Sequence, residues 1–255
     1  MAKKIVVTNA KGGVGKSTTS LNLADALRFV GFRVLLVDLD PSRNATSVYT
    51  KKREDIKTLK NLLEGEKAKN CIYKADFGDI IPGDKYLARE RSELYRACTD
   101  DPAFIKKALK SVEKDYDYII FDTPPTINTW MISAIYAADG AVCPVLPAKF
   151  ALDGLSELLE SLNDLEKEMK HKLPIYGILL TGFDMRNSQD NTIKDMLPTL
   201  GSALGVNVFE TSISKCQEVE KCITANRSLF EAKPNSKAAV DYVNWVKELL
   251  EIMEG

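Results

Sequence analysis

Residues 12–17 combine three glycines with a lysine and a serine. Gly12, Gly13 and Gly15 would let the backbone pass close to phosphate oxygens, because glycine has no side chain. Lys16 would then reach the β- and γ-phosphates, and the Ser17 hydroxyl would bind Mg²⁺. These residue types at this spacing predict a nucleotide-binding site.

Two flanking elements must position this loop. Residues 5–7 predict a buried strand, and the apolar residues after Ser17 recur at helical spacing. The first N–H groups of a helix lack partners within it, and the helix dipole favours negative charge there. A chance glycine turn gives the same short motif, but these flanking elements favour the nucleotide site. The strict P-loop pattern requires glycine at position 10, where this chain has Ala10, and a second lysine, Lys11, precedes the glycines.

The segment KGGVGKST resembles the deviant P-loop of the ParA/MinD superfamily of ATPases. The resemblance implies that Lys11 crosses a dimer interface and contacts the phosphates held by the other subunit. It also implies catalytic roles for Lys11 and Lys16, with ATP and Mg²⁺ as cofactors. The nucleotide contacts implied in this segment are Lys11, Gly12, Gly13, Val14, Gly15, Lys16, Ser17 and Thr18.

A second candidate segment, YIIFDTPP, ends a predicted strand at residues 118–122. In a parallel sheet, Asp122 would lie at the same edge as the glycine loop, where its carboxylate would hold Mg²⁺, usually through water. Pro124 belongs to a stiff turn able to sense a γ-phosphate. The alternative is that Asp122 only ends the strand. The form D-x-P-P again resembles the ParA group, which places Asp122 and Pro124 among the nucleotide contacts.

A third segment, VDLDPSRNAT, carries two aspartates at the end of another predicted strand. It is similar to the family form DxDPQGNAT, in which the second aspartate, here Asp40, positions or polarises the attacking water. Asp40 and Asn44 are kept, whereas Ser42 and Arg43 replace the usual Gln and Gly. The alternative is that Asp38 and Asp40 only cap the strand. The metal ligands expected from the three segments are Ser17, Asp40 and Asp122.

The resemblance implies a slow, Mg²⁺-dependent ATP hydrolase that acts as a switch and is stimulated by a partner. Phosphoryl transfer to water depends mostly on positioning and charge neutralisation. A lysine supplied by the other subunit makes hydrolysis depend on dimerisation. The chain has no N/T-K-x-D motif for guanine, which favours ATP. By resemblance, the adenine would bind between residues 182–186 and 213–216.

The C-terminal segment PNSKAAVDY is similar to the ParA signature P-x-S-[RK]-A-A-x-D-Y. ParA dimers bind DNA non-specifically through basic residues along one edge. The candidates here are Arg186, Lys215, Lys221, Arg227, Lys233 and Lys237. Glu218, Glu220 and Glu231 occur in the same region, so a solvated surface of mixed charge is the alternative.

We therefore expect an ATP-dependent homodimer that binds DNA non-specifically and partitions a plasmid or chromosome with a ParB-like partner. The amphipathic segment at residues 89–96 is a candidate surface for that partner. The alternative is a protein-positioning or scaffold switch, with MinD-like logic and no DNA binding. MinD-type proteins end in a basic amphipathic helix that lies on a membrane, whereas VKELLEIMEG is acidic, so we expect no membrane contact.

The chain has 255 residues, of which 45% are hydrophobic and 28% charged, as expected for one globular domain over residues 1–255. A formal net charge of −1 means that any nucleic-acid contact must come from a local patch. Five scattered cysteines without a C-x-x-C pair indicate reduced thiols in a cytoplasmic protein. The resemblance to ParA implies that the protein is nucleoid-associated when ATP is bound. His171 is the only histidine, which excludes histidine triads and multi-histidine metal sites.

Alternating strands and helices predict an α/β fold with a doubly wound, mostly parallel sheet flanked by helices, as in P-loop NTPases. We expect residues 39–57 to be loop. Strands are expected at residues 5–7, 33–38, 78–81, 118–122, 141–145, 175–181 and 206–209. Helices are expected at residues 17–30, 58–64, 101–112, 131–138, 153–170 and 190–201, the last interrupted at Pro198, and after Pro234.

Overall fold

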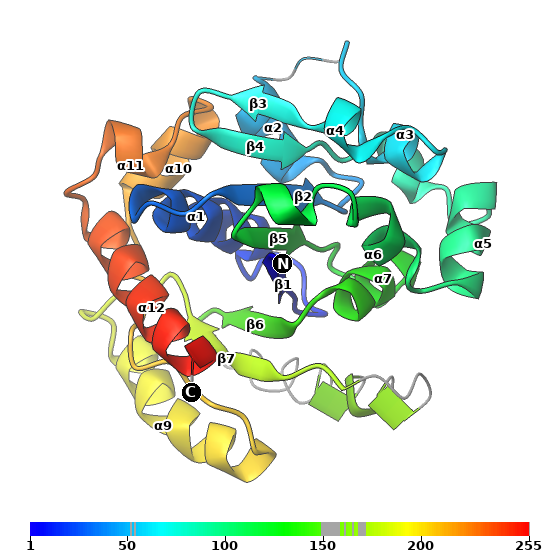
Figure 1. Cartoon of the computed structure of the whole chain (residues 1–255). Helices are drawn as coiled ribbons and strands as arrows, with labels where there is room; N and C mark the ends of the chain where they lie inside the picture. Colours follow the sequence, from blue (N-terminus) through cyan, green and yellow to red (C-terminus); the bar gives the residue numbers. More distant parts are fainter. Residues whose placement is uncertain are drawn as a thin grey trace.

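The computed structural model describes residues 1–51, 53, 55–148, 159–160, 162–164, 166–167 and 172–254. Their seven strands form one sheet in the order β3-β4-β2-β5-β1-β6-β7, in which only the β3–β4 pair is antiparallel (Figure 1). The strands are β1 Lys3–Val7, β2 Val34–Asp38, β3 Tyr73–Ala75, β4 Gly78–Ile81, β5 Tyr118–Asp122, β6 Gly140–Val145 and β7 Ile175–Leu180. The doubly wound, mostly parallel α/β fold is confirmed.

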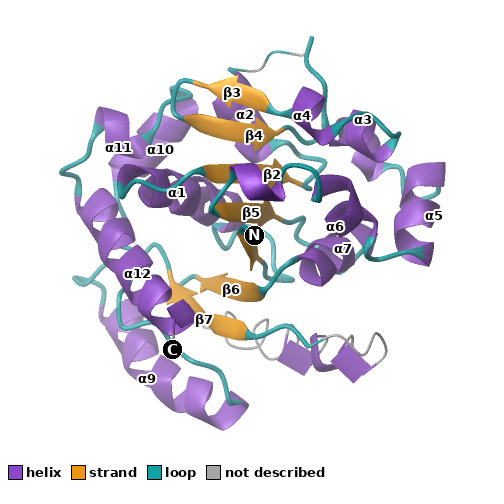
Figure 2. Cartoon of the chain, in the orientation of Figure 1, coloured by secondary structure: helices purple, strands orange, loops and turns teal. Residues whose placement is uncertain are grey.

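Helices cover both faces of this sheet (Figure 2). The α-helices are α1 Lys16–Phe29, α2 Asn44–Thr50, α3 Leu59–Leu63, α4 Ala68–Cys71, α5 Glu93–Asp100, α6 Phe104–Leu109, α7 Thr129–Ala137, α9 Ser188–Leu204, α10 Gln217–Thr224, α11 Leu229–Ala232 and α12 Lys237–Glu254. Short 3₁₀ turns occur at Lys85–Ala88 and Glu113–Asp115. Among the described helices, none is long and apolar enough to cross a membrane.

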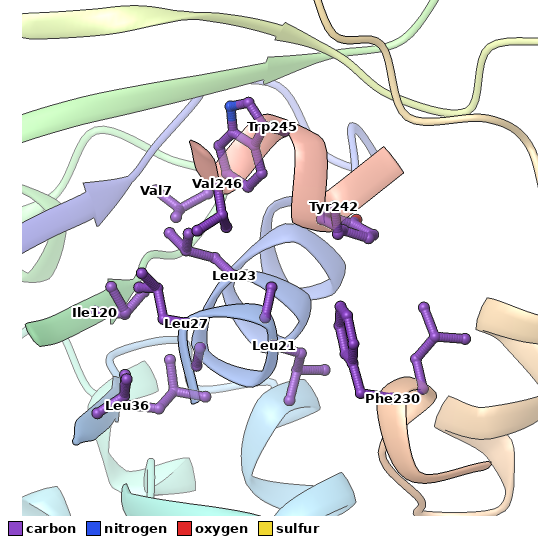
Figure 3. Close-up of a cluster of buried hydrophobic side chains, with 14 of the residues drawn as sticks. Val7, Leu21, Leu23, Leu27, Leu36, Ile120, Phe230, Tyr242, Trp245 and Val246 are labelled. Carbon is purple, nitrogen blue, oxygen red and sulfur yellow. The ribbon is translucent and has the colours of Figure 1, made fainter. Parts of the chain in front are cut away.

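The alternation of side chains along each strand divides the core into two layers. Ile5 and Val7 of β1 point to the layer formed with α1 and α12, whereas Val6 points to the layer formed with α3, α6 and α7. Figure 3 shows Leu23 and Leu27 of α1 packed in the first layer. Because both faces are buried, the strands are continuously apolar, as is typical of parallel sheets.

Strand register brings three strand ends together at one edge of the sheet. Val7 of β1 pairs with Asp122 of β5, and Asp38 of β2 pairs with the same aspartate. The loops that follow β1, β2 and β5 therefore leave the sheet side by side. This is the edge at which an open α/β sheet binds its ligands.

Several expected elements differ in the structure. Residues 39–57 are not all loop, because α2 forms there and buries Val48 and Tyr49. Helix α9 runs through Pro198 without interruption, and Leu197 and Gly201 on either side of it are buried. The strand expected at residues 206–209 is reduced to one bridge, between Ile178 and Val208.

Helix boundaries also shift where a capping side chain acts. The amphipathic helix expected at residues 89–96 is α5, which begins later because Ser92 accepts a hydrogen bond from Tyr95 N at 3.2 Å. Helix α6 is shorter than the expected residues 101–112. The helix expected at residues 153–170 lies mostly outside the described residues.

Asp25 of α1 is a buried carboxylate that accepts a hydrogen bond from Ser228, next to α11. Burial raises the pKa of Asp25 to about 6, and the Ser228 hydroxyl and Arg28 only partly oppose this shift. A raised pKa in the folded state means that the folded chain binds this proton more tightly than the unfolded chain. The stability contributed by the proton is complete at low pH and is lost as the pH rises to about 6.

Asp25→Asn is therefore expected to be more stable than the wild type above this range. The gain should approach about 2–3 kcal/mol at pH 7 and vanish near pH 4, because asparagine keeps an acceptor for Ser228 without a charge. Urea unfolding of both proteins across this pH range measures the difference. Asp76→Asn, at an exposed aspartate, is the control. A gain that does not change with pH would contradict the assignment to Asp25.

Candidate nucleotide-binding site

The glycine loop adopts a backbone that requires glycine at two positions. Gly13 has φ 76° and Gly15 has φ 87°, in the left-handed region that residues with a Cβ atom rarely adopt. Among the described residues, the N–H groups of residues 12–15 have no hydrogen-bond acceptor. Helix α1 begins directly after Gly15 and adds its own unpaired N–H groups. The loop therefore offers a row of donors to an anion.

Two polar residues outside the predicted set anchor this loop. The amide nitrogen of Asn9 donates to Pro144 O at 2.9 Å, and its oxygen accepts from Lys11 N at 3.0 Å. The Thr181 hydroxyl donates to Val14 O at 3.3 Å. Both side chains are buried and tie the loop to the ends of β6 and β7. The position of Asn9 two residues after an apolar strand was the only sequence signal for this role.

Lys16 folds back onto its own loop. Its Nζ donates to the carbonyl oxygen of Lys11 at 2.8 Å. Burial lowers the pKa of Lys16, and the negative charges of Asp122 and Asp40 partly oppose the shift. The ammonium group is therefore desolvated within the loop and lies within electrostatic range of both predicted carboxylates.

Asp122 is fully buried at the end of β5. Its Oδ1 accepts a hydrogen bond from Ser20 Oγ at 2.9 Å, whereas Oδ2 has no hydrogen-bond partner among the described residues. Burial raises the pKa of Asp122 above its ordinary value, and the nearby Asp38 raises it further. The Ser17 and Ser20 hydroxyls oppose the shift. A cation at this position would stabilise the ionised form.

Asp38 has a different surrounding from Asp122. Its oxygens accept from Asp40 N at 3.0 Å, from Thr46 N at 2.9 Å and from Thr46 Oγ1 at 2.6 Å. The Thr46 hydroxyl in turn accepts from Gly83 N at 2.7 Å. Asp38 is thus satisfied by protein donors and holds the turn that carries Asp40.

Asp40 is buried, and its Oδ1 accepts from Ser42 N at 2.7 Å. Its charge acts on both Lys16 and Asp122, so the structure brings Asp40 to the same site as the glycine loop. Pro124 follows β5 in a turn next to the loop, since a Cβ atom at Gly12 would lie 3.8 Å from Pro125 Cβ.

Of the three residues expected to hold Mg²⁺, Ser17 and Asp122 offer the oxygen ligands that suit this ion. The unpartnered Asp122 Oδ2 lies near the Ser17 hydroxyl, and hard oxygen ligands of this kind suit Mg²⁺. Across the described residues, no group of three or more His, Cys, Asp or Glu side chains could hold a metal by itself. A magnesium ion here would also need phosphate oxygens and water, as is usual at nucleotide sites.

A cavity of about 480 Å³ lies beside the glycine loop. Both segments expected to hold the base contribute to it, one through Gly182 and the other through residues 213–216. Its remaining lining includes Thr18 and Tyr242. The volume suits a small organic ligand, and the position joins the phosphate-binding loop to a partly apolar pocket.

All six candidate DNA-binding side chains are exposed, but acidic groups neutralise several of them. Arg186 Nε lies 3.1 Å from Asp184 Oδ1 in an ion pair. Glu218 lies near Lys221 and Lys233, whose charges help to lower the pKa of that carboxyl. Lys237 lies beside the exposed Met185. The remaining two candidates are Lys215, just before α10, and Arg227, just before α11.

Comparison with known proteins places this site in a family. The AAA domain family model matches residues 2–175. The chain is 34% identical to the sporulation initiation inhibitor protein Soj of Bacillus subtilis over 253 residues, covering 98% of each chain. It is 32% identical to the chromosome-partitioning ATPase Soj of Thermus thermophilus, covering 97% of this chain and 95% of the relative.

A solved structure with the same fold is apo McdA from Cyanothece, with a TM-score of 0.84 and 23% identity over 98% of this chain and 100% of that one. At that identity the likeness shows the fold alone. The two Soj proteins show the family as well as the fold, because they are more than 30% identical to this chain over nearly its whole length. The chain belongs to the ParA/Soj family of partition ATPases, within the ParA/MinD superfamily.

Proposed function

We propose that this protein binds ATP with Mg²⁺, dimerises, binds DNA non-specifically, and hydrolyses ATP slowly when a ParB-like partner stimulates it. The observation that carries the proposal is the strand register that sets Asp122 between the ends of β1 and β2. The unpaired N–H groups of residues 12–15 at the same edge support it. The protein would act in the cytoplasm, on the nucleoid when ATP is bound.

The chain's own residues would bind and orient the substrate. The free loop N–H groups would donate to phosphate oxygens, and Lys16, whose Nζ donates to the Lys11 carbonyl, would also donate to a phosphate oxygen. Asp40, held by Ser42 N, would accept a hydrogen bond from the attacking water and orient it. Mg²⁺, when bound by Ser17 and Asp122, would neutralise phosphate charge.

Lys11 would complete the site of a second copy of the chain. Its backbone is held by Asn9 and Lys16, while its side chain makes no hydrogen bond or ion pair within the described residues. A lysine supplied in this way would make hydrolysis rise with protein concentration. Phosphate release measured at several concentrations of the wild type tests this dependence.

DNA binding is expected only with ATP and should weaken steeply with salt. A protein that neutralises six phosphates loses about 1,000-fold in affinity between 50 and 200 mM salt. The double variant Lys233→Glu/Lys237→Glu should weaken binding to all sequences alike. Mobility-shift titrations with ATP, ADP and no nucleotide measure both effects. Lys106→Glu, an exposed lysine of α6, is the matched control.

The second candidate function is a switch that positions a protein and does not bind DNA. The pairing of Arg186 with Asp184 and the position of Glu218 favour it, because both reduce positive charge at the candidate surface. ATP hydrolysis without any ATP-dependent DNA shift would support this second function. A salt-sensitive shift with ATP would exclude it.

A further inference from the structure

The turn after β2 holds Arg43 in an uncommon backbone conformation. Its φ is 58° and its ψ is 35°, in the left-handed region. A residue with a Cβ atom pays a free-energy cost there that glycine does not. Such conformations persist where the surrounding structure imposes them, and they concentrate at functional sites.

Hydrogen bonds fix this turn on both sides of Arg43. Its N–H donates to Asp40 O at 2.9 Å, and its carbonyl oxygen accepts from Ser47 N at 2.9 Å. Ser42 N donates to Asp40 Oδ1 at 2.7 Å. The point from which the Arg43 side chain departs is therefore set relative to Asp40, the residue expected to orient the attacking water.

Among the described residues, no hydrogen bond or ion pair accounts for the position of the Arg43 side chain. Its Nε is buried and makes no hydrogen bond, and no acidic side chain among the described residues pairs with the guanidinium. Lys51, at the other end of α2, provides a comparison within the chain. It is also left-handed, with φ 50°, but its Nζ lies 3.3 Å from Asp76 Oδ2 in an ordinary exposed ion pair.

A guanidinium presents five N–H donors in a planar arrangement that matches phosphate oxygens. The turn that carries Arg43 belongs to the phosphate side of the molecule, because it follows β2, whose last residue, Asp38, pairs with Asp122. The site combines three buried carboxylates, Asp38, Asp40 and Asp122, with one buried lysine. A triphosphate would add further negative charge, so an additional cation has a clear electrostatic role.

We propose that Arg43 contacts the terminal phosphate of the nucleotide bound by its own chain and stabilises the charge that develops there during hydrolysis. This inference rests on the proposed ATPase function. It makes Arg43 a catalytic residue that acts beside Asp40. The free-energy cost of the left-handed backbone at Arg43 is then offset by the position that the turn gives to the guanidinium.

Arg43→Asn and Arg43→Gly remove the cation without disfavouring the conformation of the turn, since asparagine and glycine both accept the left-handed region. We expect kcat for ATP hydrolysis to fall about 100- to 1,000-fold in both, as when one preorganised donor is removed. Affinity for ADP with aluminium fluoride, which mimics the transferring phosphoryl group, should fall similarly, while affinity for ADP alone stays within about threefold. Arg43→Lys should recover part of the loss.

Lys51→Asn is the matched control and should leave kcat unchanged. If the wild type hydrolyses ATP and the Asn and Gly variants do so equally fast, Arg43 has no catalytic role and the proposed function still stands. An equal loss of affinity for ADP and for its aluminium fluoride complex would indicate a structural role and overturn the inference. A wild type that neither binds nor hydrolyses ATP would overturn the proposed function and this inference together.

Discussion

Lys16→Ala is expected to abolish ATP binding and ATP-dependent dimerisation. Lys16 is the buried cation of the glycine loop, and its Nζ bonds only the Lys11 carbonyl among the contacts described above. A charge-assisted hydrogen bond to phosphate contributes about 1.5–3 kcal/mol, and the loss of the charge itself adds to this. We expect ATP affinity to fall by at least about 100-fold, since each 1.4 kcal/mol is tenfold.

Equilibrium binding of ATP and sedimentation with and without ATP measure the two effects. The thermal unfolding temperature without nucleotide should not fall, because burial already disfavours the charged lysine, as its lowered pKa indicates. Lys69→Ala, at an exposed lysine of α4, controls for loss of positive charge. A sedimentation profile that still shifts with ATP in Lys16→Ala would contradict the role of the loop.

Asp40→Ala is expected to trap the ATP-bound dimer. Removal of a group that orients or deprotonates the attacking water costs about 100- to 10,000-fold in rate. Binding should persist, because the loop donors and Lys16 remain. The expected result is a large fall in phosphate release together with a dimer that survives for longer after mixing with ATP.

Asp40→Asn separates the water-orienting role from the turn. Asparagine keeps an oxygen that can accept from Ser42 N, so the turn remains while the carboxylate is lost. Both variants should be slow if the carboxylate acts on water. Full activity in Asp40→Asn would assign Asp40 to the turn alone, and Asp195→Asn on α9 controls for the change in net charge.

The parallel sheet and the loop could be predicted because their signals are local. Each central strand is a short apolar run bounded by polar residues, and the loop needs its glycines at the two positions with positive φ. Asp122 could be placed at the site because it ends a strand. In a parallel sheet that position alone determines the edge at which the side chain lies.

Other elements depended on contacts that are distant in the sequence. Helix α2 is rich in Asn, Thr and Ser, which predict loop by composition, yet Val48 and Tyr49 find apolar neighbours in α1 and β4. Asn9 and Thr181 looked like ordinary strand-end residues, because their partners lie more than a hundred residues away. The hydrophobic periodicity of a sequence does not indicate hydrogen bonds between residues so far apart along the chain.

The sequence shows that Arg43 replaces the usual glycine of the family, but it does not show the effect on the turn. The replacement of the usual glycine by Arg43 left the geometry of this turn open. The structure has a left-handed backbone at Arg43, whose N–H donates to Asp40 O and whose carbonyl oxygen accepts from Ser47 N. The left-handed conformation of Arg43 is defined by its φ and ψ angles, which the sequence does not give.

The hydrogen bond between Lys16 Nζ and the Lys11 carbonyl joins the phosphate-binding lysine to the backbone of the lysine expected to contact the other subunit. The ammonium group has three N–H donors, so one can bond a phosphate oxygen while another keeps the Lys11 carbonyl. A nucleotide bound by one subunit would then be connected through Lys16 to the backbone of Lys11, the residue proposed to act on the second subunit.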